Sequence, residues 1–145
     1  MASMVTLVRV LEAKDPYTKG HSERVSEMAQ IMAQHKWGAV PETSALALAG
    51  RLHDIGKVAI PDSILLKPGK LTEEEMALMK KHPEFGSQAI RKAQESIEEN
   101  EFLNIAAEIA EFHHERWDGT GYPHGITGET IPLPARIMAI ADVYD

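Results

Sequence analysis

The chain contains no cysteine, which excludes disulfide bonds and thiolate metal sites and leaves imidazole and carboxylate as its strong metal ligands. It also lacks an apolar run near the roughly 20 residues that a membrane-spanning helix needs. Its first residues do not combine a basic segment, a hydrophobic stretch and a cleavage site, as a secretion signal would. These absences predict a cytoplasmic protein without membrane insertion, in which any metal is bound by nitrogen and oxygen.

Positively charged side chains are also scarce. Lys and Arg total 15 against 22 Asp and Glu, and the formal net charge is -7. This balance disfavours the broad basic surface that long nucleic acid requires, although it allows a small phosphorylated ligand. Seven histidines are many for 145 residues, and a local cationic site would follow if several of them bind divalent ions.

Hydrophobic spacing predicts an all-α fold, because apolar residues recur at helical intervals and no segment alternates as a strand would. The length fits a single domain, residues 1–145, with one core. Thr72 with Glu75 forms a capping box, and Pro83 begins a new helix at His82. The expected helices cover 4–13, 21–37, 41–52, a turn at 61–65, a segment after Thr72, a segment from His82 with Phe85, Ala89, Ile90 and Ala93 on one face, 102–114 and 135–144.

The run His53-Asp54-Ile55-Gly56-Lys57 places two metal-ligand side chains next to each other and an ammonium one helical turn after the first. A His-Asp pair alone is weak evidence, because such pairs also occur at ordinary surface helix ends. Further candidate ligands lie at separated positions that a helical fold could bring together. They are His21, His82, His113, His114 and Asp142.

This set of residues indicates a binuclear metal site. Each histidine taken alone is more often a core or surface residue, but one site explains all of them together. Asp54 is the natural bridge, because its two oxygens can reach two ions. Two ions about 3.5 to 4 Å apart can hold a bridging hydroxide and clamp both oxygens of a phosphoryl displacement. Lys57 is placed to stabilise charge on the phosphate, so Asp54 and Lys57 are the candidate catalytic residues.

A long loop rich in glycine and aromatic residues, 115–125, precedes the last predicted helix; such loops usually carry function or are disordered. With it, the chain resembles the HD-GYP branch of the HD superfamily of metal-dependent phosphohydrolases, from Asp15 to Asp145. The resemblance implies a compact HD-type helical bundle with a long GYP loop, and hydrolysis of the bacterial messenger cyclic di-GMP. The matching segments are GHSER at 20–24, HDIGK at 53–57, Pro61, Lys67, His82-Pro83 with Gly86, His113-His114-Glu115, DGTGYP at 118–123 and Ala141-Asp142.

The resemblance also assigns roles to residues of this chain. It implies that Lys57 is the catalytic lysine and that Asp145 lies near the guanine or phosphate of the substrate. It further implies that the GYP segment shapes the substrate side and contacts a GGDEF diguanylate cyclase domain. The implied metal ligands are His21, His53, Asp54, His82, His113, His114 and Asp142, and the implied substrate-side residues are Gly121, Tyr122 and Pro123.

Two departures from the family pattern qualify this assignment. Some members hold a third metal with a glutamate four residues before the first histidine, where this chain has Tyr17, so we expect two ions. Members also continue past the final aspartate with arginine-containing substrate contacts, whereas this chain stops at Asp145. We therefore expect a domain truncated at its C-terminus, with weak activity as a fragment.

Other functions and metals stay open. The fold could serve as a silent signalling module that binds a diguanylate cyclase domain through the loop at 117–125. It could also be an HD hydrolase of another nucleotide. Imidazole and carboxylate suit iron or manganese, which we favour, and also nickel or zinc.

Overall fold

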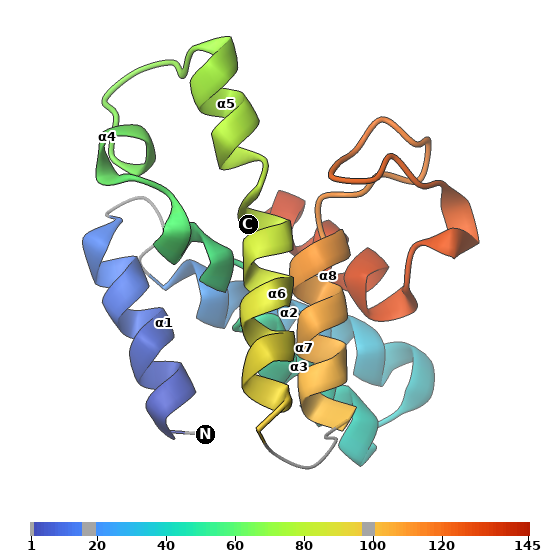
Figure 1. The fold of residues 1–145 in the computed structure, drawn as a ribbon. Coiled ribbons are helices and arrows are strands. Elements are labelled where there is room, and N and C mark those ends of the chain that lie inside the picture. Colours follow the sequence, from blue (N-terminus) through green and yellow to red (C-terminus); the bar gives the residue numbers. More distant parts are fainter. Residues whose placement is uncertain (1, 16–19, 97–100) are drawn as a thin grey trace.

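The computed structural model describes residues 2–15, 20–96 and 101–145. Within these ranges the chain forms helices and loops without a strand (Figure 1), which confirms the all-α prediction. None of the described helices is long and apolar enough to cross a membrane. The elements are α1 (Ala2–Lys14), α2 (His21–Trp37), α3 (Pro41–Gly50), η1 (Ile55–Ala59), α4 (Asp62–Leu65), α5 (Glu73–Met79), α6 (His82–Gln94), α7 (Glu101–Phe112), η2 (Gly128–Thr130) and α8 (Leu133–Tyr144).

Local sequence signals account for several helix boundaries. Thr72 Oγ1 accepts the Glu75 N–H at 3.1 Å, and the Glu75 carboxylate accepts the Thr72 N–H at 3.3 Å, so the predicted capping box is confirmed. Pro83 lies in the first turn of α6, where its missing N–H removes no helical hydrogen bond. The α3 helix ends at Gly50, earlier than predicted, because the chain then tightens into turns. In these turns the His53 N–H donates to the Gly50 carbonyl at 3.1 Å.

The hydrophobic core lies where α2 packs on α3 and α8, and where α7 packs on α3, α6 and α8. Three of the buried residues of α7 are alanines, Ala106, Ala107 and Ala110. The predicted face of α6 is wrong in part, because Ala89 and Ala93 are exposed. The buried stripe follows Pro83, Gly86, Ser87 and Ile90 instead, at the helical spacing of three and four residues. Core residues include Val25, Ala29, Leu46, Ala49, Leu103, Ala106, Ile109, Ile137 and Met138.

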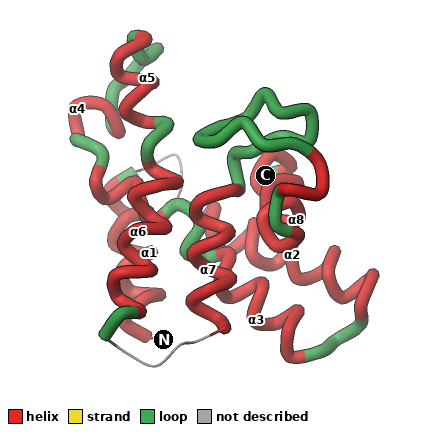
Figure 2. The backbone as a smooth tube through the Cα atoms, turned by 45° about the vertical axis from the view of Figure 1, so that its right-hand side comes forward, coloured by secondary structure: helices red, strands yellow, loops and turns green. Residues whose placement is uncertain are grey.

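The helices α4 and α5 pack on each other and project from one end of the bundle. Figure 2 shows the long loop between α7 and α8 at the same end, beside the C-terminus. This is also the end at which α7 finishes, with His113 and His114 following its last residue, Phe112. The fold thus places the loop next to the candidate ligands.

Gly56 lets η1 pack directly against the start of α6. A Cβ on Gly56 would overlap the carbonyl oxygen of His82 and lie 2.5 Å from the amide nitrogen of Gly86. Glycine is the residue that permits so close a backbone approach. The contact brings Asp54, the residue before η1, against His82, the first residue of α6.

Candidate metal centre

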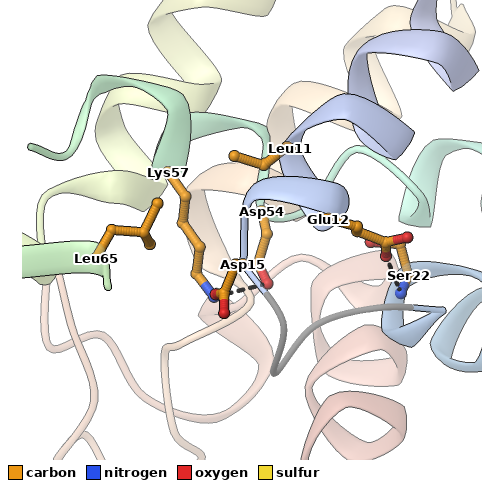
Figure 3. Close-up of a pocket in the computed structure, with 7 residues that line it drawn as sticks. All are labelled: Leu11, Glu12, Asp15, Ser22, Asp54, Lys57 and Leu65. Carbon is orange, nitrogen blue, oxygen red and sulfur yellow. Dashed lines mark hydrogen bonds and ion pairs between the residues drawn. The ribbon is translucent and has the colours of Figure 1, made fainter. Parts of the chain in front are cut away.

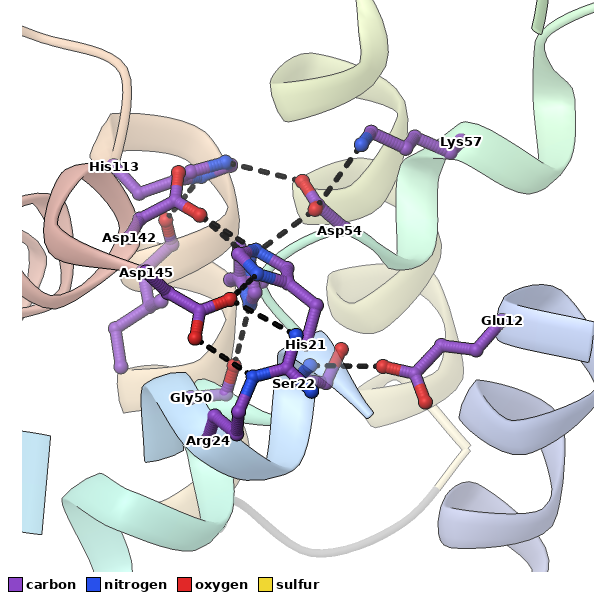
Figure 4. Close-up of polar contacts among 12 residues, drawn as sticks. Glu12, His21, Ser22, Arg24, Gly50, Asp54, Lys57, His113, Asp142 and Asp145 are labelled. Atoms are coloured by element: carbon purple, nitrogen blue, oxygen red, sulfur yellow. Dashed lines mark hydrogen bonds and ion pairs between the residues drawn. The ribbon is translucent and has the colours of Figure 1, made fainter. Parts of the chain in front are cut away.

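The predicted ligands converge on one place from the starts of α2 and α6, the turn before η1, the end of α7 and the last turns of α8. Figure 4 shows four of them, His21, Asp54, His113 and Asp142, side by side. They fall into overlapping groups, in each of which the ligand atoms lie within 4.8 Å of one another. Asp54 belongs to two of these groups. The groups are Asp54 with His82, His113 and His114; His21 with His53 and Asp54; and His53 with His113 and Asp142. The structure therefore brings together every residue that the sequence predicted as a metal ligand.

Backbone carbonyls orient three of the imidazoles. A carbonyl oxygen can only accept a hydrogen bond, so the Nδ1 atom that faces it carries the proton. The Nε2 atom of the same ring is then left with its lone pair directed into the cluster, which is the arrangement of a metal ligand. The Nδ1 to oxygen distances are 2.7 Å from His53 to Gly50, 2.8 Å from His82 to Met79 and 2.9 Å from His113 to Ile109.

The inward atoms of the cluster lack hydrogen-bond partners. Among the described residues, Nε2 of His53, His82 and His113 and Oδ1 of Asp54 are buried and unbonded. Asp54 Oδ1 nevertheless lies 3.2 Å from Nε2 of His82 and 3.3 Å from Nε2 of His113. A nitrogen lone pair and a carboxylate oxygen repel at this distance unless a proton or a cation lies between them. The donor set therefore fits a divalent metal ion bound by nitrogen and oxygen.

Asp54 is at the centre of the cluster. While its Oδ1 faces His82 and His113, its Oδ2 lies 3.2 Å from His53 Nε2 and 3.2 Å from Lys57 Nζ. Asp142 contributes the other carboxylate, with Oδ1 at 2.7 Å from His21 Nε2 and 3.5 Å from His53 Nε2. The two oxygens of Asp54 thus face different groups of histidines, as a bridging ligand would.

The electrostatics of the centre call for positive charge. Burial disfavours the Asp54 carboxylate, yet His53 and its neighbours hold the pKa of Asp54 well below its usual range. Burial also disfavours a charged His53, but Asp54 and Asp142 outweigh this and raise the pKa of His53 to about 10. His114 differs, because burial lowers its pKa to about 3, with His113 and His82 adding to the effect. A cation in this centre would be held by two carboxylates, and His114 would offer it a neutral imidazole.

Lys57 lies between the cluster and a small pocket that opens beside α1. Figure 3 shows its ammonium and Asp54 at the wall of this pocket. Among the residues that line this pocket, Lys57 is the one cation, beside the carboxylates of Glu12, Asp15 and Asp54. The pocket is lined by Leu11, Glu12, Asp15, Ser22, Asp54, Lys57 and Leu65.

Glu12 supports the first turn of α2, a role that the sequence did not reveal. Its carboxylate accepts the Ser22 N–H at 2.8 Å (Figure 4) and the Gly20 N–H at 3.3 Å, on either side of His21 in the chain. These N–H groups have no partner inside the helix, and a carboxylate at a helix N-terminus is electrostatically favourable. No sequence motif signals a cap from a residue that lies nine positions before the first residue of the helix. Tyr17, which the two-ion expectation rests on, lies outside the described residues.

The GYP segment covers the outer side of His114. The Tyr122 ring stacks on the His114 imidazole, with centroids 4.8 Å apart and planes 18° from parallel. Burial, with the charges of Asp54 and Asp142, raises the pKa of Tyr122 to about 12, so its hydroxyl stays neutral. Gly121 and Pro123 are half-buried on either side of it.

Asp145, the predicted substrate contact, lies behind His21. One carboxylate oxygen is 2.7 Å from His21 Nδ1, and the other accepts the Arg24 Nε–H at 2.7 Å. Arg24 and then His21 lower the pKa of Asp145 to about 2. Both oxygens are thus engaged within the chain, while contact with a substrate stays a prediction.

The sequence model of the HD domain family matches residues 6–145. The chain belongs to the HD domain family. A solved structure similar to this HD domain is that of Bd1817, a HDG"Y"P protein from Bdellovibrio bacteriovorus. It has a TM-score of 0.64 and 27% sequence identity, over 84% of this chain and 38% of that one. The resemblance to the HD-GYP branch and the HD-type helical fold are thereby confirmed.

Curated relatives carry enzyme names. The HD domain is 47% identical to a cyclic di-GMP phosphodiesterase of Vibrio cholerae, over 99% of this chain and 31% of the relative. It is 48% identical to the cyclic di-GMP phosphodiesterase response regulator RpfG of Xanthomonas campestris pv. campestris, over 96% and 35%. It is 44% identical to the 3'3'-cGAMP-specific phosphodiesterase 2 of Vibrio cholerae, over 96% and 26%. The chain thus spans about a third of the length of these relatives or less.

Proposed function

We propose that this HD domain is a metal-dependent phosphodiesterase that hydrolyses cyclic di-GMP in bacterial second-messenger signalling in the cytoplasm. The proposal includes residues 1–145 as one phosphohydrolase domain. The observation that carries it is the convergence of the predicted ligands around Asp54, with their unbonded atoms directed inward and Lys57 beside them. The names of the relatives support the substrate class.

In this proposal the cluster holds two divalent ions, with iron or manganese favoured and nickel or zinc also suited to the ligands. Asp54 would bridge them. When bound, the ions supply Lewis acidity that activates water and draws charge from the phosphate. One ion would be held by Asp54, His82, His113 and His114, and the other by Asp54, His21, His53 and Asp142.

Other steps of the proposed reaction depend on side chains of the protein itself. Asp54 fixes the geometry of the cluster, because its Oδ1 faces His82 and His113 while its Oδ2 faces His53 and Lys57. Lys57 neutralises charge on the phosphate from the pocket side, 3.2 Å from Asp54. On the other side, Gly121, Tyr122 and Pro123 border the place of the substrate, next to His114. Asp145 would act near the substrate in one of two ways. It would orient His21, or its carboxylate would contact the substrate directly.

Two alternatives have specific support. Relatives named for 3'3'-cGAMP favour a related cyclic dinucleotide as a second candidate substrate. Trp117, 63% exposed in the same loop, favours a surface that binds a GGDEF diguanylate cyclase domain. The second alternative predicts binding without hydrolysis, so an activity assay separates it from the enzyme.

The test is hydrolysis of cyclic di-GMP and of 3'3'-cGAMP by anaerobically metal-loaded protein, as this chain and as the longer protein that contains it. We expect the longer protein to linearise cyclic di-GMP and this chain alone to do so weakly or not at all. In the longer protein, Lys57→Ala should lower kcat about 100-fold with unchanged metal content. Lys70→Ala is the matched control, because Lys70 is an exposed lysine outside the site. The enzyme assignment is wrong if the fully metallated longer protein leaves both dinucleotides intact, or if Lys57→Ala behaves as Lys70→Ala does.

A further inference from the structure

Glu115, the residue after His114, is buried, and only 3% of the residue is exposed. Its Oε2 accepts the His124 N–H at 2.8 Å, and its Oε1 accepts the Gly125 N–H at 2.8 Å and the Ile126 N–H at 3.3 Å. Among the described residues it has no cationic partner. The carboxylate is bound by the backbone N–H groups of three successive residues, an arrangement that is also found in anion-binding turns.

A second set of contacts closes the same loop on the end of α7. The Tyr122 N–H donates to the His114 carbonyl at 3.2 Å. Gly121 lies so close that a Cβ there would be 2.6 Å from the Glu115 Cα and would overlap the His114 carbonyl oxygen. The loop from 115 to 126 is therefore fastened at Glu115 and at the backbone of His114.

These contacts have a consequence for the metal centre. Tyr122 is held by its own N–H at the second fastening point, next to the residues that Glu115 binds, and its ring stacks on His114, a predicted ligand. If the carboxylate of Glu115 were lost, the three N–H groups would be left without their acceptor, and the loop could supply water in its place by opening. Tyr122 would then leave His114, although none of the predicted ligands would have changed.

We propose that Glu115 is a positioning residue that holds the GYP loop closed against His114, so that Tyr122 forms a fixed wall of the substrate site. It touches neither the cluster nor the place of the substrate. Its part in substrate binding rests on the proposed phosphodiesterase function, whereas its part in loop closure does not. The two parts therefore have separate readouts.

Loop closure is tested by amide hydrogen exchange of the unaltered protein. His124 and Gly125 are exposed residues, yet their N–H groups should exchange at least about tenfold more slowly than those of unbonded loop residues, because they are bonded to Glu115. This measurement needs no variant and no substrate. Exchange at the rate of an unprotected peptide would overturn the proposal.

A variant then tests the carboxylate itself. Glu115→Gln removes the charge and turns an NH₂ group toward N–H donors, whereas Glu129→Gln makes the same change at an exposed site in the same connection. Glu115→Gln should raise the rate of trypsin cleavage after Arg116 about tenfold and leave the helical circular dichroism and metal content unchanged. Glu115→Asp, which keeps the charge on a shorter side chain, should cleave at an intermediate rate. Equal cleavage in Glu115→Gln and Glu129→Gln would contradict the clamp.

The catalytic part is tested with cyclic di-GMP. Glu115→Gln should raise KM about tenfold and change kcat less, because the wall of the site is displaced while Lys57 and the cluster stay in place. An unchanged KM in a protein with an open loop would refute the substrate role. If the unaltered, metal-loaded protein hydrolyses no cyclic dinucleotide but the exchange and cleavage results hold, the proposed function fails and the loop clamp stands.

Discussion

The carboxylate of Asp145 lies 2.7 Å from Nδ1 of His21, and the Nε2 atom of the same ring lies 2.7 Å from Asp142 in the cluster. Arg24 holds the other oxygen of Asp145 at 2.7 Å. His21 is therefore oriented as His53, His82 and His113 are, but by a carboxylate in place of a backbone carbonyl. A carboxylate raises the basicity of the ligand that it orients.

From this we predict that Asp145→Ala weakens the binding of the ion nearest His21 by about 10- to 100-fold. The reason is that the imidazole loses the partner that fixes its proton on Nδ1. Competition with a coloured chelator measures the change, and Glu23→Ala, at an exposed residue of the same turn, is the control. If metal affinity is unchanged and only KM for cyclic di-GMP rises, Asp145 acts on the substrate directly, as the resemblance implied.

A second prediction concerns Asp54, whose Oδ1 faces His82 and His113 and whose Oδ2 faces His53. Asp54→Ala should abolish binding of both ions, because a bridging carboxylate serves both, whereas His21→Ala should mainly weaken one. Metal content per chain after dialysis, measured by elemental analysis, distinguishes the two results. Similar losses in both variants would argue against Asp54 as the bridge. Fewer than one ion per chain in the unaltered, reconstituted protein would refute the binuclear site itself.

The ligands could be predicted from the sequence because their residue types are distinctive and because the chain resembles a known family. Local signals were equally direct: the capping box at Thr72 and the start of α6 at Pro83 depend on neighbours in the chain. Such features need no knowledge of the tertiary structure. They fix where the helices begin, and hence where His82 lies.

The supporting residues could not be predicted, because their roles depend on contacts between distant segments. Glu12 accepts N–H groups from the start of α2, across residues that include Tyr17, and a sequence pattern gives no reason to pair them. Glu115 was noticed only as part of a matching segment, since its three acceptor bonds exist once the loop has folded back. Ala89 was wrongly predicted to lie on the buried face of α6, because alanine is common at both buried and exposed positions.

A third prediction is a pH dependence of the metal-free protein. Despite its burial, His53 has its pKa raised by Asp54 and Asp142 to about 10, above the ordinary 6.5. A raised pKa stabilises the folded state fully below the unfolded value, and this stabilisation is lost as the pH rises through the folded value. The melting temperature without metal should therefore fall between pH 6.5 and pH 10.

Bound metal ions should prevent this fall in melting temperature at alkaline pH, because they replace the proton of His53. Metal uptake near pH 8 should accordingly release about one proton per chain from this residue, which calorimetry in buffers of different ionisation enthalpy would detect. His114 contributes with the opposite sign at lower pH, since burial lowers its pKa to about 3 and stability is lost as its unfolded form takes up protons below about pH 6.5. An unchanged melting temperature from pH 6.5 to 10 without metal would contradict the charge assigned to His53.

The last prediction concerns Lys80, whose ammonium lies over the Tyr122 ring, 5.3 Å from its centroid. In the described part of the chain Lys80 makes no ion pair, whereas Lys57 is paired with Asp54. A cyclic dinucleotide carries two phosphates, and the cluster together with Lys57 can bind one of them. If the proposed function holds, we predict that Lys80 contacts the other phosphate on the Tyr122 side.

Lys80→Ala should therefore raise KM for cyclic di-GMP roughly fivefold, in line with one solvent-exposed charge interaction, and leave kcat and metal content unchanged. Lys81→Ala removes the adjacent exposed lysine and should have little effect. Because the interaction is exposed, the difference between the Lys80 variant and the unaltered protein should shrink as salt rises from about 0.05 to 0.5 M. Equal KM values for the two lysine variants at low salt would exclude a substrate contact at Lys80, whereas a fall in kcat alone would place Lys80 in the chemical step.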